Sequence, residues 1–236
     1  MIIFNHFQLE LVAHHYQLDK TATWVVSHGN KLAFCKIEKV MSTFMTATMC
    51  YLNRSQEFIE KKRNIHTDTW FIRFCGYSIE YEEYKNQTVP ANYSMASVIR
   101  HPLTRFLSGF MDKCVKEQEK SPKICYQCNR SLRYCPFSMQ DYAIIPYGDD
   151  ERGREIMVEK FLGVIRNANA TQEQLTYIEQ ELNYKSPHAT KNNDLKEQYK
   201  KELLESPEMM RKFLHIFYFD FIFFGIPLPG LENMPN

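Results

Sequence analysis

A lysine and two hydroxyl residues stand where a short apolar stretch gives way to an amphipathic one. The sequence LAFCKIEKVMSTF predicts a strand over Leu32–Ile37, followed by a turn that carries Lys39. Ser42 and Thr43 then open a segment whose apolar spacing predicts a helix over 43–53. Backbone N–H groups at the start of a helix bind phosphate, and a lysine beside them adds positive charge. The segment therefore predicts an anion site.

A second segment repeats this layout about sixty residues later in the chain. It reads SVIRHPLTRFLSGF, with a predicted strand over Ser97–Arg100 and a helix that begins at Pro102. The Arg100 guanidinium ends the strand and can donate two parallel hydrogen bonds to a phosphate, and Ser108 follows on the helix. Two such units imply a nucleotide with a phosphate at either end.

In this order the two segments resemble those of the carbohydrate sulfotransferases, which use 3'-phosphoadenosine 5'-phosphosulfate as sulfate donor. The resemblance implies that Lys39, Ser42 and Thr43 surround the 5'-phosphosulfate. It also implies that Arg100 and Ser108 bind the 3'-phosphate.

Later segments extend the resemblance. Asp112-Lys113-Cys114 is similar to the pair that often closes the second motif, and YFDFIFFG at Tyr218–Gly225 resembles the terminal signature. Lys191 follows the sequence SPHAT, which resembles a family segment that folds over the nucleotide, so Lys191 is expected to reinforce the 3'-phosphate site. Over residues 31–229 the chain looks closest to the chondroitin/dermatan sulfotransferase branch, in a divergent form typical of nematodes.

The resemblance implies an enzyme that transfers a sulfuryl group to a glycan hydroxyl, on a chondroitin-type glycosaminoglycan as in a chondroitin 4-sulfotransferase. It implies the phosphosulfate donor, no metal, and a place in the Golgi lumen or membrane. Negative charge builds on the leaving phosphate during transfer, so Lys39 is the expected catalytic cation. A carboxylate or histidine must take the acceptor proton, and His66 and Glu80 are the two candidates.

Two alternatives remain open at this point. Glu38 stands where the family usually has proline, and Val40 and Met41 fill a turn that commonly holds a small residue or glycine. A carboxylate beside a dianion is repulsive unless it points away or pairs with Lys36, which keeps open a non-catalytic glycan-binding relative. A P-loop nucleotide kinase or NTPase would also place Lys and Ser/Thr at a helix start, but its glycine-rich loop is missing here.

Length and composition fit one ordinary α/β domain. The 236 residues are 44% hydrophobic, enough for a sizeable core, and the net charge of +1 disfavours a nucleic-acid partner. Strands alternating with helices predict a P-loop-like three-layer sandwich, with a central parallel sheet flanked by helices. Residues 1–30 are expected to form an irregular N-terminal extension. Residues 31–236 form the predicted sulfotransferase domain, with a Cys-rich insertion at about 114–135.

The remaining patterns predict further elements and give no membrane span. The N-terminal MIIFNHF lacks the basic flank and long apolar run of a signal peptide or anchor, so membrane association would need an anchor not evident in this chain. The apolar-rich stretch 213–228 is short and is expected to be buried. A strand is predicted over 69–75, and helices over 138–143, 154–165, 171–182, 195–204 and from Pro207 toward Tyr218.

The seven cysteines allow two interpretations. Cys114, Cys125, Cys128 and Cys135 could form a zinc site or a disulfide-bonded loop. The count is odd, so at least one thiol is expected to be free, most simply Cys35 in the first strand. An excess of N-glycosylation sequons favours an oxidising lumen and therefore disulfides. These sequons begin at Asn53, Asn86, Asn92, Asn129 and Asn169.

Overall fold

The computed structural model describes residues 23–68, 72–82, 88–116, 141–184 and 193–229. The chain divides into two compact units, and each is described by itself. The sheet unit consists of Leu18–Arg100 and Tyr126–Ala189. The helical unit consists of Met1–Gln17, His101–Cys125 and Thr190–Asn236. The division into an N-terminal extension and one sulfotransferase domain stays a prediction.

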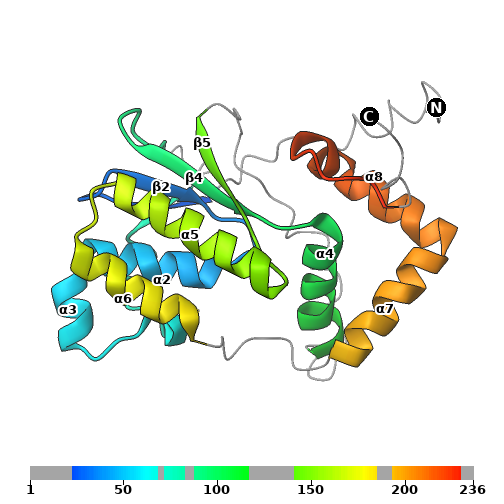
Figure 1. Ribbon diagram of the computed structural model, residues 1–236, viewed down its shortest axis with the longest axis horizontal. Coiled ribbons are helices and arrows are strands. Elements are labelled where there is room, and N and C mark those ends of the chain that lie inside the picture. Colours follow the sequence, from blue (N-terminus) through cyan, green and yellow to red (C-terminus); the bar gives the residue numbers. More distant parts are fainter. Residues whose placement is uncertain (1–22, 69–71, 83–87, 117–140, 185–192, 230–236) are drawn as a thin grey trace. The chain divides into compact units, whose positions relative to one another are not determined.

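The sheet unit is built on a mixed five-stranded sheet of order β3-β1-β2-β4-β5 (Figure 1). Strands β2, β4 and β5 run parallel, and β1 is antiparallel to both β2 and β3. The α/β prediction with parallel central strands is thus confirmed, with an antiparallel edge added. The strands are β1 (Thr23–Ser27), β2 (Leu32–Cys35), β3 (Glu80–Glu82), β4 (Ser94–Ile99) and β5 (Tyr142–Pro146).

Strand β1 corrects the expectation of irregular structure up to residue 30. Thr23–Ser27 pairs with β2, and the tight turn between the two strands is closed where the Ser27 hydroxyl donates to Asn30 Oδ1 at 2.8 Å. Val25 and Val26 are completely buried. The stretch is too short for a clear sequence periodicity, and pairing with β2 is what makes it a strand.

Helices α2 (Ser42–Asn53), α5 (Glu151–Asn167) and α6 (Gln172–Asn183) lie together over one face of the sheet (Figure 1). The Phe161 ring of α5 lies 5.4 Å from that of Phe34 in β2 and 6.1 Å from that of Phe44 in α2. These contacts join the helices and the sheet in one apolar core. All three helices agree with the sequence predictions. The short helices α3 (Ser55–Glu60) and η1 (Ile65–Thr67) follow α2.

Two secondary-structure predictions are wrong. Residues 72–75 are irregular rather than a strand, because the Asp68 carboxylate accepts a hydrogen bond from Phe74 N and pairs with Arg63. Residues 69–71 lie outside the described part of the chain. Tyr142 begins strand β5 where a helix over 138–143 was expected, since its backbone pairs with β4.

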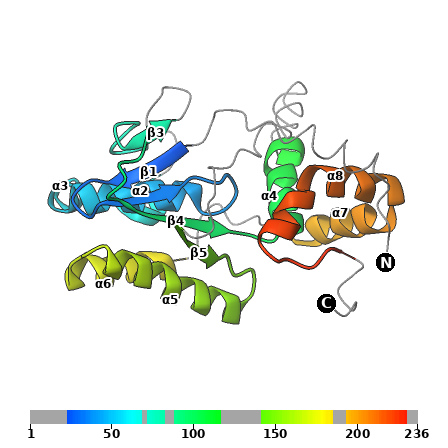
Figure 2. The same cartoon turned by 90° about the horizontal axis from the view of Figure 1, so that it is seen from above.

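The helical unit contains α4 (Pro102–Phe110), its π-helical continuation η4 (Met111–Lys116), α7 (Asn193–Glu205) and α8 (Pro207–Phe223) (Figure 2). Pro102 begins α4 as predicted. The Phe106 ring of α4 lies 5.6 Å from Phe213 and 6.0 Å from Phe217 of α8. Phe213, Phe217 and Phe221 of the apolar C-terminal stretch are buried, as expected. Ile216, Ile222 and Phe223 of the same helix are exposed, so the expectation holds for one face of α8 only.

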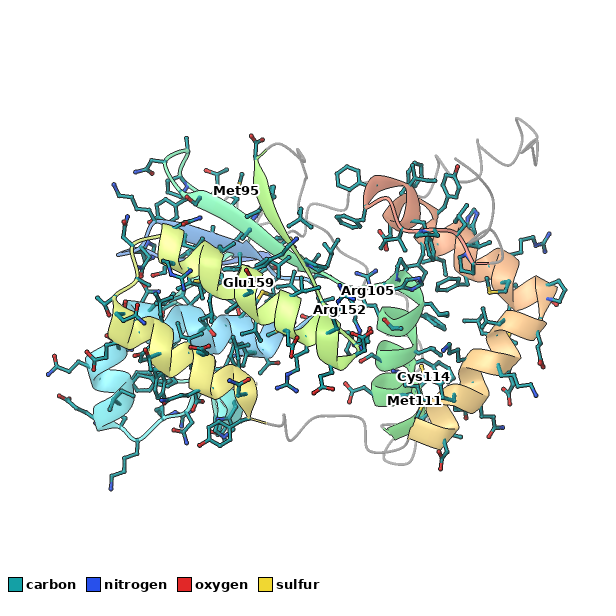
Figure 3. The ribbon with its side chains drawn as sticks, viewed as in Figure 1. Met95, Arg105, Met111, Cys114, Arg152 and Glu159 are labelled. Atoms are coloured by element: carbon teal, nitrogen blue, oxygen red, sulfur yellow. A yellow bond between two sulfur atoms is a disulfide. The ribbon has the colours of Figure 1, made fainter. Side chains whose placement is uncertain are left out.

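One buried ion pair crosses this aromatic cluster. Arg105 of α4, labelled in Figure 3, places Nη2 at 3.1 Å from Asp220 Oδ2 of α8. Burial raises the pKa of Asp220 to about 6, and the nearby Arg105 charge opposes that rise. A buried pair of this kind is costly to break, because either charge alone would lack compensation.

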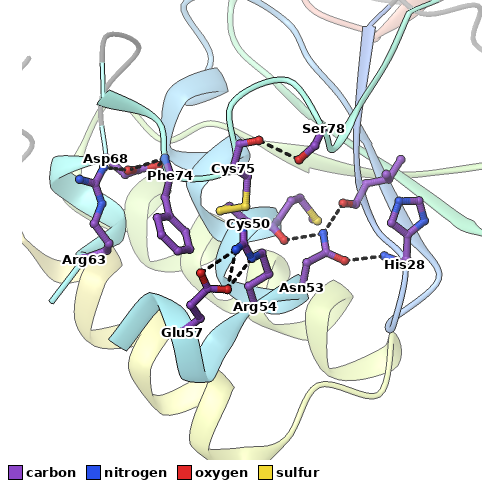
Figure 4. Close-up of a disulfide and its surroundings, with 12 residues drawn as sticks. His28, Cys50, Asn53, Arg54, Glu57, Arg63, Asp68, Phe74, Cys75 and Ser78 are labelled. Carbon is purple, nitrogen blue, oxygen red and sulfur yellow. Dashed lines mark hydrogen bonds and ion pairs between the residues drawn. A yellow bond between two sulfur atoms is a disulfide. The ribbon is translucent and has the colours of Figure 1, made fainter. Parts of the chain in front are cut away.

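Disulfides stabilise the fold where the sequence left the cysteine chemistry open. Cys50 of α2 is bonded to Cys75 at a Cα–Cα distance of 5.7 Å (Figure 4). Closing this 25-residue separation contributes about 3.5 kcal/mol in the chain-entropy model. Cys35 and Cys114 are also disulfide-bonded, so the expectation that Cys35 is free is wrong. Cys125, Cys128 and Cys135 lie outside the described residues.

No helix within the described ranges is long and apolar enough to cross a membrane. The same residues contain no group of three or more His, Cys, Asp or Glu side chains that could hold a metal ion.

Candidate functional site

The candidate site lies at the edge of the sheet where the three parallel strands end. Strand β2 leads into the turn that carries Lys39, β4 leads into Arg100, and β5 leads into Tyr147 and Asp149. Tyr147 N donates to Ile99 O at 2.6 Å, which holds the ends of β4 and β5 side by side. Ligands of open α/β sheets bind at this edge, where the strand carboxyl ends and helix starts meet.

The turn after β2 is held in an unusual backbone conformation. Lys39 and Met41 both have left-handed backbones, with φ of 64° and 56°. Each costs about 1 kcal/mol or more for a residue with a side chain, which explains why a small residue or glycine suits such a turn. The side chains of Ile37 and Val40 are almost completely buried and anchor the turn to the core. The turn is therefore preorganised rather than loose.

Helix α2 begins directly after this turn without a side-chain cap. Its N-cap residue is Met41, which gives no capping hydrogen bond, and the first turn contains no acidic residue. The first N–H groups of the helix therefore have no capping side chain, as a phosphate site requires. Ser42 is buried at the first helical position and Thr43 follows it, half-buried. Ser42 is thus not the ordinary helix cap that its residue type would suggest.

Glu38 contacts the same serine. Ser42 Oγ donates to Glu38 Oε2 at 3.4 Å, and the Glu38 residue is exposed. Lys36 pairs with Glu80 at 3.1 Å. Lys36 is thus paired with Glu80 rather than with Glu38. The Glu38 carboxylate instead contacts the Ser42 hydroxyl, next to the expected phosphate position.

Arg100 joins three loops at the strand ends. Its Nη2 pairs with Asp149 Oδ1 while its Nε donates to Asp149 Oδ2 at 3.3 Å, so the carboxylate takes the forked face of the guanidinium. Its Nη1 donates to Lys39 O at 3.4 Å, and its guanidinium carbon lies 4.5 Å from the centre of the Tyr147 ring. The structure thus brings Arg100 to the turn that carries Lys39.

Asp149 and Tyr147 were missed by the sequence analysis. A helix was predicted over 138–143, so the following residues were not recognised as the end of a parallel strand. The signal that could have found them is the β-branched pair Ile144-Ile145 followed by Gly148 and two aspartates.

The two candidates for the general base occupy different surroundings. Glu80 Oε1 accepts from Lys36 at 3.1 Å and from Arg73 at 2.6 Å, and the Glu80 side chain is buried. Both contacts are made by the same oxygen, so Glu80 Oε1 is already occupied by two charged donors.

His66 instead contacts a single buried carboxylate. Its backbone N lies 3.0 Å and its Nδ1 lies 2.7 Å from Glu181 Oε2 of α6, and its ring stacks on Tyr184 at 4.5 Å. The carboxylate on Nδ1 fixes the orientation of the ring, so Nε2 is the nitrogen that would take a proton from an acceptor hydroxyl.

The other predicted site residues lie elsewhere in the chain. Ser108 belongs to α4 of the helical unit and is half-buried. Lys191 lies outside the described residues. The site described in the sheet unit thus contains Lys39, Ser42, Thr43 and Arg100.

Comparison with known proteins agrees with this arrangement. The model of the sulfotransferase family matches residues 22–143, which is 122 of the 236 residues. The chain belongs to the sulfotransferase family. A carbohydrate sulfotransferase of Caenorhabditis elegans is 29% identical to it, over 85% of this chain and 74% of the relative. An uncharacterized protein of the same organism is 25% identical, over 90% and 71%. No solved structure matches the chain.

The matched region includes both segments at the candidate site of this sulfotransferase. Enzymes of the family take the sulfuryl group from 3'-phosphoadenosine 5'-phosphosulfate. The donor carries anionic groups at two positions. The cationic and N–H groups that could bind them, Lys39, Arg100 and the start of α2, lie where the parallel strands end. The P-loop kinase or NTPase alternative loses its support, because the family match accounts for the lysine and hydroxyl pair.

Asp149 contacts the face of Arg100 that a phosphate would use. We expect Asp149→Asn to bind adenosine 3',5'-bisphosphate about two- to fivefold more tightly, since partly exposed ion pairs are worth about 0.2–1 kcal/mol. Isothermal titration calorimetry at fixed salt would measure the change. Asp141→Asn removes the same charge just before β5 begins and should leave affinity unchanged. Weaker binding by Asp149→Asn would show instead that the carboxylate positions Arg100 for the ligand.

Proposed function

We propose that this sulfotransferase transfers the sulfuryl group to a hydroxyl of a glycan, in particular a chondroitin-type glycosaminoglycan. The observation that carries the proposal is the meeting of Arg100 with the Lys39 turn at the uncapped start of α2. The carbohydrate acceptor is supported by the 29% identical carbohydrate sulfotransferase. The chondroitin acceptor and the 4-position rest on the C-terminal signature at Tyr218–Gly225.

We assign the donor site as follows. Lys39, the hydroxyls of Ser42 and Thr43, and the first N–H groups of α2 bind the 5'-phosphosulfate. Arg100 binds the 3'-phosphate after it releases Asp149. From the sequence resemblance, we also assign Ser108 and Lys191 to the 3'-phosphate. No metal is required, because fixed cations and N–H groups supply the charge stabilisation.

In this account the chemistry is an in-line displacement. The acceptor hydroxyl oxygen attacks sulfur while the bond from sulfur to the bridging phosphate oxygen breaks, and negative charge builds on that oxygen. The Lys39 ammonium stabilises the charge where it develops, and a base takes the hydroxyl proton.

A lumenal location follows from the same proposal. Glycan acceptors of this kind are made in the Golgi. The Cys50–Cys75 disulfide, and the disulfides that include Cys35 and Cys114, require an oxidising compartment. We propose the Golgi lumen, with membrane association through an anchor outside the described elements.

Transfer of labelled sulfate to defined acceptors tests the proposal directly. The purified protein, given the phosphosulfate donor, should sulfate desulfated chondroitin, with the label on the 4-position of N-acetylgalactosamine. Activity should persist in a chelator. Transfer to another glycan alone would correct the acceptor, and donor binding without transfer to any glycan would support the non-catalytic relative that Glu38 keeps open.

We further propose His66 as the general base, in preference to Glu80, because a single carboxylate orients its ring. His66→Gln should lower the turnover number by about a hundredfold or more while the donor affinity stays unchanged. Glu181→Gln keeps the hydrogen bond but removes the charge, so its turnover should fall less. His28→Gln is the matched control, since that histidine bonds Tyr93 beside the β1–β2 turn, and it should retain turnover. Full activity in His66→Gln would exclude His66 as the base.

A further inference from the structure

We propose that Asn92 and Asn169 are the described residues that carry N-linked glycans, and that Asn53 does not, although all three begin a sequon. The proposal rests on the lumenal location proposed above. It concerns side chains away from the donor site and distinguishes among sequons that are equivalent in sequence.

Both the nitrogen and the oxygen of the Asn53 side-chain amide form hydrogen bonds within the fold. Its Nδ2 donates to Val26 O at 2.7 Å and to Met49 O at 2.9 Å, and its Oδ1 accepts from His28 N at 2.8 Å (Figure 4). These bonds connect the end of α2 to the end of β1. Both amide hydrogens are used, so a sugar on Nδ2 would break at least one of them and displace β1. A glycan on Asn53 is therefore incompatible with the full set of these hydrogen bonds.

Asn92 and Asn169 have the opposite surroundings. Both are exposed, and each lies outside a helix or strand: Asn92 in the turn before β4, and Asn169 just after α5 with φ of 60°. Within the described part of the chain, neither side chain makes a hydrogen bond. A left-handed backbone also suits asparagine better than most residues, so Asn169 fits its turn without using its amide. Both amide nitrogens are thus accessible.

Both accessible sequons lie at the edge of the sheet opposite the donor site. Ser94 N donates to Lys31 O at 2.8 Å, and Asn30 Nδ2 donates to Ala168 O at 3.0 Å. The two sequons thus flank the β1–β2 turn, where the parallel strands β2 and β4 begin. Lys39 and Arg100 follow the other ends of the same strands. Glycans at this edge would leave the donor site open.

The modification requires a lipid pyrophosphate-linked oligosaccharide as co-substrate. The Asn Nδ2 forms a bond to C1 of the first sugar while the bond from C1 to the pyrophosphate oxygen breaks. Nδ2 loses one proton, and the lipid pyrophosphate leaves. Only an amide nitrogen that is not committed to the fold can keep such a substituent.

Site mapping on the full chain, secreted from insect cells behind a cleavable signal sequence, tests the proposal. Enzymatic deglycosylation in H₂¹⁸O converts each glycosylated Asn to labelled Asp, and peptide mass spectrometry locates the label. We expect label at Asn92 and Asn169 and none at Asn53. Asn92→Gln and Asn169→Gln should each lose one glycan and keep the melting temperature of the deglycosylated wild type.

Two variants at the buried sequon complete the test. Ser55→Ala destroys the sequon but leaves the Asn53 hydrogen bonds, so it should change neither glycan number nor melting temperature. Asn53→Gln should keep the glycan number and lower the melting temperature. Label at Asn53, or an unlabelled Asn92 or Asn169 in secreted protein, would overturn the assignment of that site. Glycan mapping does not depend on sulfate transfer, so its outcome is separate from that of the transfer assay.

Discussion

The site depends on the contacts that the Arg100 guanidinium makes with three neighbouring loops. Three parallel strands end at one edge, and the loops that follow them are connected through this single side chain. It donates to Lys39 O after β2, pairs with Asp149 after β5, and lies against Tyr147. Because the Lys39 and Met41 backbones are left-handed, the turn needs support, and the buried Ile37 and Val40 side chains and the Arg100 hydrogen bond provide it.

This arrangement explains how a nearly neutral protein can bind a polyanionic donor. In the described structure the Asp149 carboxylate compensates the charge of Arg100, one of the two site cations. An anion that displaces Asp149 exchanges one charge-assisted contact for another, so its net gain is smaller than that of binding to a bare cation. Glu38, which accepts a hydrogen bond from the Ser42 hydroxyl, adds a further negative charge beside the same turn.

The parts of the site that local sequence determines could be predicted, and the parts that pairing determines could not. The strand, turn and helix around Lys39, and the helix that begins at Pro102, follow from apolar spacing and proline. Strand β5 was read as a helix because its identity comes from pairing with β4, and Asp149 was missed for that reason. Cys35 was expected to be free, because disulfide pairing depends on tertiary proximity rather than on spacing along the chain.

The central claim is that Lys39 acts on the transition state and Arg100 on donor binding. Comparing kcat and KM after replacement of each residue tests this claim most directly. Steady-state rates with the phosphosulfate donor and a saturating glycan acceptor would be compared for wild type, Lys39→Ala and Arg100→Ala, with Lys31→Ala as a control at the other end of β2. The account predicts that Lys39→Ala lowers kcat by about a hundredfold or more, as expected when one preorganised electrostatic group is lost. Arg100→Ala should chiefly raise KM for the donor. An unchanged kcat in Lys39→Ala would contradict the account, because Lys39 would then be a surface residue of the turn.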